Sequence, residues 1–68
     1  MLEFAKRLDA LRFDTEEEAQ EVIDTIIIIP GPMARWRWDI EELNGFRCTG
    51  FVIYQISEGY RDYVGDFA

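Results

Sequence analysis

Histidine is absent from this sequence, which removes the commonest general base and the commonest transition-metal ligand. The single cysteine, Cys48, cannot form an internal disulfide, so we expect a reducing, cytoplasmic setting. The apolar run TIIIIPGPM is too short to cross a bilayer, and the first residues lack the continuous apolar stretch of a signal peptide. The sequence therefore predicts no membrane association.

Positive charge is also scarce, because 7 basic residues stand against 14 acidic ones and the net charge is −7. Such a chain is repelled by the phosphate backbone, so we expect no direct binding of nucleic acid. The negative charge is concentrated, since residues 13–34 contain no Lys or Arg. The acidic residues of that segment are Asp14, Glu16, Glu17, Glu18, Glu21 and Asp24.

Motifs for chemistry are missing as well. The acidic run TEEEAQE lacks the interleaved turn residues of a calcium loop, and GFRCTG lacks the spacing and context of a phosphate-binding loop. Cys48 has no histidine to activate it. The sequence predicts no catalytic residue, no metal and no cofactor, and hence no enzyme.

What is present is a core, since 49% of the 68 residues are hydrophobic and 15% are aromatic. We expect one small domain over residues 1–68. Asp14 or Thr15 can cap a helix that ends before Pro30, and Thr15 with Glu18 has the spacing of a capping box. The apolar positions recur at helical spacing and form one stripe: Ala19, Val22, Ile23, Ile26 and Ile27.

Two strands are predicted around Asn44 and Gly45, because Asn-Gly between alternating segments is a strong signal for a two-residue hairpin turn. The predicted cross-strand pairs are Leu43 with Phe46, Glu42 with Arg47, Ile40 with Thr49, Trp38 with Phe51 and Trp36 with Ile53. A three-residue turn at residues 57–59 adds a third strand. Its predicted pairs are Ile56 with Tyr60, Tyr63 with Ile53, Gly65 with Phe51 and Phe67 with Thr49, and Gly65 leaves room for Phe51 and Trp38.

These elements predict a two-layer α+β domain, in which one amphipathic helix packs on a three-stranded antiparallel meander. The sheet face toward the helix is mostly aromatic and consists of Trp36, Trp38, Ile40, Phe51, Ile53, Tyr63 and Phe67. The two tryptophans could instead stack nucleic-acid bases, but burial is favoured by their apolar partners. Residues 2–13 fit either a helical stripe or an extra strand, and we favour a strand near residues 11–13.

The other sheet face raises two alternatives, because its centre is apolar but its edge carries Arg and Tyr. That composition is typical of the core of a protein interface, although the N-terminal segment could also cover it. We predict a partner-binding surface. Its candidate residues are Arg35, Arg37, Val52, Tyr54, Asp62 and Val64 on the sheet, with Glu17, Glu21 and Asp24 on the helix.

Two functions follow from these features. The first is an acidic protein-binding module, an inhibitor or adaptor acting on a basic protein surface. In its format of a tiny, acidic domain without histidine, the chain is similar to accessory inhibitors that bacteriophages encode against host nucleases and defence complexes. The alternative is a small homo-oligomer that binds an anionic molecule such as a nucleotide, with charge from Arg35 and Arg37 and stacking from Tyr54 or Tyr60.

Overall fold

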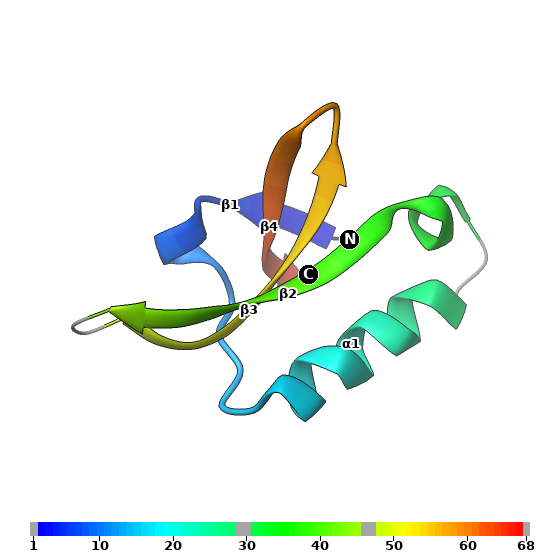
Figure 1. Cartoon of the computed structure of the whole chain (residues 1–68). Coiled ribbons are helices and arrows are strands. Elements are labelled where there is room, and N and C mark those ends of the chain that lie inside the picture. The colour runs from blue at the N-terminus through cyan, green and yellow to red at the C-terminus, as the bar shows by residue number, and fades with distance from the viewer. Residues whose placement is uncertain (1, 29–30, 46–47, 68) are drawn as a thin grey trace.

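The computed structural model describes residues 2–28, 31–45 and 48–67, apart from the side chains of Pro32, Met33 and Phe67. One helix, α1 (Glu16–Ile28), packs on an antiparallel sheet, as Figure 1 shows. The sheet order is β1-β4-β3-β2, and the 3-10 helices η1 and η2 precede α1 and β2, respectively. The remaining bounds are β1 (Leu2–Ala5), η1 (Arg7–Asp9), η2 (Pro32–Arg35), β2 (Arg37–Gly45), β3 (Cys48–Ser57) and β4 (Tyr60–Phe67). The predicted α+β class is confirmed.

Helix α1 begins where the sequence predicts, because the backbone N–H of Glu18 donates to Thr15 Oγ1 at 3.2 Å. This bond satisfies one of the helix's first N–H groups, which have no partner within the helix. The predicted apolar stripe packs on the sheet through Ala19, Ile23 and Ile26, which are buried. Ile27, predicted to belong to the same stripe, is instead 48% exposed.

The register between β2 and β3 differs from the predicted one. Asn44 and Gly45 belong to β2 and pair with Thr49 and Cys48, so they do not form the turn. Phe46 and Arg47, the partners predicted for Leu43 and Glu42, lie outside the described residues, but Leu43 pairs with Gly50. The pairs predicted for residues 38–43 are displaced by four residues, and Trp36 lies outside β2. Because this displacement is even, each of these side chains stays on its predicted face.

The register between β3 and β4 differs from the predicted one by one residue. This smaller displacement has the larger effect, because it changes the face on which side chains lie. Ser57 pairs with Tyr60, so the turn contains only Glu58 and Gly59. Both have positive φ, 51° and 84°, as a type I′ hairpin requires. A one-residue displacement moves each side chain of β4 to the opposite face. Tyr63, predicted beside Ile53 under the helix, therefore pairs with Tyr54 on the far face.

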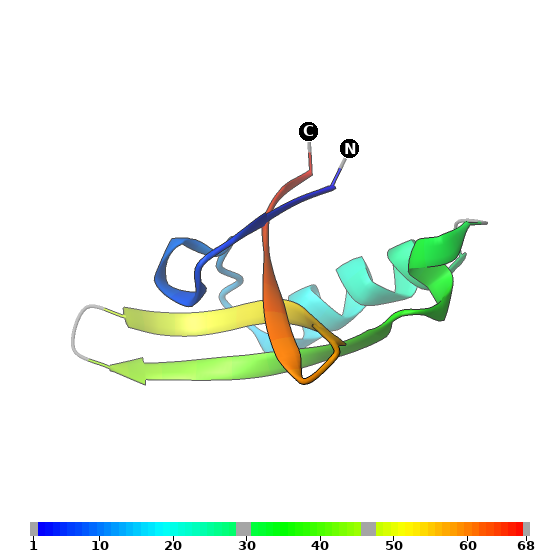
Figure 2. The same ribbon diagram turned by 90° about the horizontal axis from the view of Figure 1, so that it is seen from above.

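The N-terminal segment forms an extra strand, but at residues 2–5 and not at residues 11–13. β1 pairs with the end of β4, from Leu2 opposite Phe67 to Ala5 opposite Tyr63. Phe13 makes only an isolated bridge, exchanging both backbone hydrogen bonds with Phe51. In Figure 2, β4 crosses the β2–β3 hairpin steeply, and the chain between η1 and α1 runs beside that crossing.

Each face of the sheet carries its own core. On the α1 side, Ile53 and Val64 are fully buried against Ala19 and Ile23. On the far side, the cluster contains Ala10, Leu43, Val52, Tyr54 and Tyr63.

Gly65 allows β1 to approach β4 closely. A Cβ atom added at Gly65 would lie 2.7 Å from the Cβ of Ala5, closer than real Cβ contacts. The predicted role of Gly65, making room for Phe51 and Trp38, is therefore wrong.

Candidate functional site

The predicted site residues of α1, η2 and the start of β2 are accessible to a partner. Glu17, Glu21 and Asp24 are exposed along α1, and Arg35 and Arg37 are exposed at and after the end of η2. Arg37 pairs with Ile56, which pairs in turn with Arg61. Arg37 therefore does not lie beside Val52, which pairs with Glu41 instead.

The apolar centre of the predicted sheet surface is covered by the chain itself. Val52 is fully buried and Tyr54 is 5% exposed, and both pack in the cluster that contains Ala10. Ala10 directly follows η1, so the N-terminal segment completes this core, as the alternative interpretation expected. The expectation of an open surface at Val52 and Tyr54 is wrong, because a small domain buries apolar area wherever its own chain can reach it.

Val64 and Asp62 lie on the other face. Val64 is fully buried against α1, so no partner can contact its side chain in this fold. Asp62 pairs with Gln55 and accepts a hydrogen bond from its Nε2 at Oδ2, at 2.6 Å. The one-residue change of register between β3 and β4 explains both corrections.

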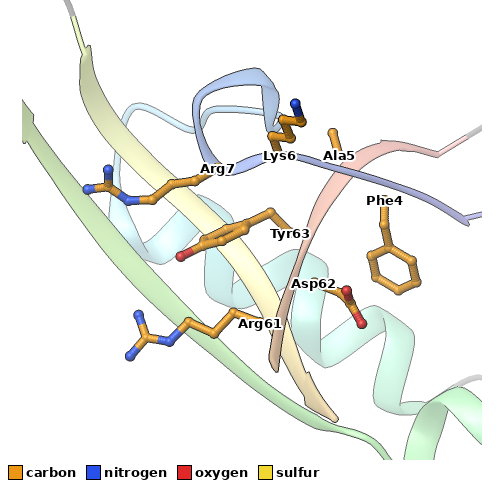
Figure 3. A pocket seen from close by; sticks show the side chains of 7 residues that line it. All are labelled: Phe4, Ala5, Lys6, Arg7, Arg61, Asp62 and Tyr63. Atoms are coloured by element: carbon orange, nitrogen blue, oxygen red, sulfur yellow. The ribbon is translucent and has the colours of Figure 1, made fainter. Parts of the chain in front are cut away.

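Instead of an open apolar patch, the far face carries an ion-pair network around Glu41. Glu41 Oε2 accepts from Arg7 Nε, and Oε1 accepts from Arg61 Nη1 at 2.9 Å and from Tyr63 Oη at 2.7 Å. Burial alone raises the pKa of Glu41, but the hydrogen bonds from Tyr63 and Arg7 and the two positive charges outweigh it, so the pKa is lowered. Figure 3 shows the side chains of Arg7, Tyr63 and Arg61 extending together to this side of β4.

Tyr54 lies on the same face of the sheet as Tyr63, and two contacts hold its side chain there. Its hydroxyl donates to Asp39 Oδ2 at 3.3 Å, and the guanidinium carbon of Arg61 lies 4.6 Å from the centre of its ring. Burial, and then the charge of Asp39, raises the pKa of Tyr54. Because one face of the ring already contacts a cation and the residue is buried, Tyr54 is not free to stack on a ligand.

A second feature lies on the α1 side of the sheet, where Trp38 pairs with Gln55 and Phe4 pairs with Val64. The ring centres of Phe4 and Trp36 are 6.0 Å apart, and those of Trp36 and Trp38 are 5.9 Å apart. We call these three residues the aromatic ledge. Trp38 packs against the α1-side core as predicted, but Trp36 is 38% exposed and Phe4 is 41% exposed. The prediction that both tryptophans are core residues therefore holds for Trp38 only.

An open hollow of about 530 Å³ lies where β1 leaves the edge of β4. Phe4 and Asp62 lie on one side of it, and Figure 3 shows them next to each other, whereas Arg7 and Arg61 extend to the other side. The complete lining is Phe4, Ala5, Lys6, Arg7, Arg61, Asp62 and Tyr63. The hollow therefore joins the aromatic ledge to a carboxylate.

Sequence reasoning named Asp62 but missed the groups around it. Phe4 lies in the segment that fits either a helical stripe or a strand, and no sequence signal separates Glu41 from the other acidic residues. Gln55 gave the best available signal, because a lone amide inside the apolar strand FVIYQI needs a hydrogen-bond partner when it is buried. That partner is Asp62.

Among residues 2–28, 31–45 and 48–67, no group of three or more His, Cys, Asp or Glu side chains is placed so that it could hold a metal ion. No helix in the described part of the chain is long and apolar enough to cross a membrane. Comparison of the chain with protein-family models, curated proteins and solved structures found no match. The function is therefore argued from the site alone.

Proposed function

We propose that the chain is a non-enzymatic, acidic protein-binding module, an inhibitor or adaptor, that acts on a basic protein surface. The observation that carries this proposal is the charge of α1. Its exposed charged residues are all acidic, and the ion pairs given for the described residues involve Glu41 alone. Within the described residues, the side chain that donates to an α1 carboxylate is a neutral amide, Gln20, whose Nε2 donates to Asp24 Oδ1 at 3.0 Å.

Carboxylates grouped on one helix repel one another, and the helix dipole favours only those in the first turn. Glu21 and Asp24 lie beyond that turn. A partner that places Lys or Arg opposite them relieves this repulsion and gains from long-range attraction during encounter. Ile27 and Ile28, 48% and 79% exposed at the end of the same helix, add apolar area that the association can bury.

The remaining features are consistent with this function. One cysteine suits a reducing compartment, and we place the protein in the cytoplasm. The small size and net charge of −7 support the similarity in format to bacteriophage inhibitors. The alternative, a nucleotide bound between copies, loses Tyr54 as a stacking residue because its ring already carries Arg61, and would depend on Tyr60, which is 73% exposed.

The test uses the chain as bait for proteins from its native host. The wild-type chain is compared with a variant that carries Glu17→Lys, Glu21→Lys and Asp24→Lys. We expect the wild type to capture a basic protein that the variant does not. The association rate of that pair should fall roughly tenfold or more as salt is raised, with less change in the dissociation rate.

A matched control carries the same change of charge away from α1, as Glu3→Lys, Asp9→Lys and Glu58→Lys, all at exposed positions. It should keep most of the binding, provided that circular dichroism shows all three proteins folded. Equal loss of binding in both variants would mean that binding depends on net charge alone and not on the carboxylates of α1. Association rates that respond neither to salt nor to the α1 substitutions would refute the proposal.

A further inference from the structure

We propose that the hollow beside Phe4 and Asp62 binds a guanidinium group, the side chain of an arginine on the partner. This inference rests on the proposed function in one respect, namely that the guanidinium belongs to a partner protein. The chemistry comes from two neighbouring features, an aromatic surface that is partly open to solvent and a carboxylate that lacks a cation among the described residues.

The aromatic ledge supplies the first half of the site. Phe4 and Trp36 are in ring contact, with an interplanar angle of 35°, and each keeps more than a third of its surface exposed. Faces of aromatic rings attract cations that approach within about 6 Å of the ring centre. The cation–π contact given for the described residues, Arg61 over Tyr54, lies on the opposite face of the sheet. Phe4 and Trp36 therefore offer ring faces to a cation from outside the chain.

Asp62 supplies the second half. Gln55 is 5% exposed and donates to Asp62 Oδ2 at 2.6 Å, so a buried amide fixes the position of the carboxylate. No Lys or Arg in the described part of the chain forms an ion pair with Asp62. Figure 3 shows Lys6 projecting away from it and Arg61 extending to the other side of β4. Among the described residues no donor reaches Asp62 Oδ1, so the carboxylate can accept hydrogen bonds from a ligand.

A guanidinium fits these two halves better than an anion or a simple ammonium does. It is flat, so it stacks on a ring while its edge donates two parallel hydrogen bonds to a carboxylate. An anion would be repelled by Asp62 and by the net charge of −7. Arg7 and Arg61 also line the hollow, but Glu41 already binds both of them. The field of the acidic α1 lies on the same side of the sheet and favours the cation further.

The experiment titrates a peptide of six arginines into the protein and follows the indole N–H signals of Trp36 and Trp38 by NMR. An ionic strength of about 0.15 M limits the reach of distant charges to about 8 Å. We expect the Trp36 signal to move, and binding to weaken roughly threefold or more in Phe4→Ala and in Asp62→Asn, the size of one exposed cation–π contact. A peptide of six lysines, equal in charge, should bind more weakly.

Matched controls separate the site from general effects. Leu8→Ala removes another exposed apolar side chain of the N-terminal segment, and Glu42→Gln removes another carboxylate from the sheet. Both should bind the arginine peptide as the wild type does. Equal affinity for the two peptides, an unmoved Trp36 signal, or equal weakening by the controls would overturn the guanidinium site.

The two proposals fail in different ways. The triple α1 substitution should slow association of the arginine peptide but still allow the Trp36 signal to move at saturation. If the α1 variant binds its host partner normally and Trp36 still responds to the arginine peptide, the proposed function fails and the guanidinium site stands. If the salt and α1 effects appear without any response of Trp36, the guanidinium site fails alone.

Discussion

Replacing Glu41 with glutamine should lower the free energy of unfolding by about 1.5 kcal/mol. The side chain of Glu41 is 19% exposed, whereas those of Arg7 and Arg61 are 49% and 53% exposed. Ion pairs to such exposed arginines contribute little, because solvent and salt screen them. The larger loss is at the hydroxyl of buried Tyr63, whose bond to a charged acceptor is about twice as strong as one to a neutral amide.

Thermal melts measured by circular dichroism test this number. For a domain of this size, 1.5 kcal/mol corresponds to a decrease in Tm of roughly 6–12 °C. Glu42→Gln is the matched control, because Glu42 is the adjacent acid of β2, is exposed and points to the other face. Its Tm should stay close to that of the wild type.

The pH dependence of stability independently tests whether the charged form of Glu41 stabilises the fold. The pKa of Glu41 is lower in the folded chain than in the unfolded chain, so its contribution to stability is complete above the unfolded pKa. That contribution disappears as pH falls through the folded pKa. The difference in Tm between the wild type and Glu41→Gln should therefore be large near neutral pH and vanish in acid. A difference that is independent of pH, or no larger than that of Glu42→Gln, would refute the reasoning.

Two further predictions concern the packing of β4. Gly65→Ala should destabilise the fold by about 1–3 kcal/mol, because the new Cβ lies 2.7 Å from that of Ala5, and Ala5→Gly in the same chain should restore part of the loss in urea denaturation. Failure of the double variant to recover would place the strain elsewhere. Val64→Asp should leave the chain largely unfolded by circular dichroism, because it buries an unpaired charge under α1. A folded Val64→Asp protein would contradict the observed face of β4.

The difference between the two hairpins shows what alternation of side chains can and cannot predict. Along the first half of β2, apolar and charged residues alternate, and this pattern assigned Trp38 and Ile40 to one face correctly; Ile53 lies opposite Ile40 on that face although the register was displaced. Along β4, both parities contain apolar residues, Tyr63 on one and Val64 on the other. The pattern therefore did not distinguish the faces, and the assumed turn length decided them wrongly.

The turn itself depended on a conformation that the residue types did not favour. Glu58 adopts φ of 51°, which is uncommon for a residue other than glycine, asparagine or aspartate. A three-residue turn with Gly59 alone in that region was the simpler prediction. The helix cap at Thr15 was predictable because it depends on neighbouring residues, whereas the contact of Phe4 with Trp36 joins segments far apart in the sequence.

The arrangement of charges on the two sides of the sheet links the stability of the chain to its proposed function. On the far side, Arg7 and Arg61 bind Glu41, so two cations of an acidic chain are partly neutralised within the fold. On the α1 side, the carboxylates of the helix and of Asp62 lack a cation among the described residues. We therefore expect a negative potential beside α1. A basic partner attracted by the net charge of −7 would be guided to that side, where apolar area and ring faces are also exposed.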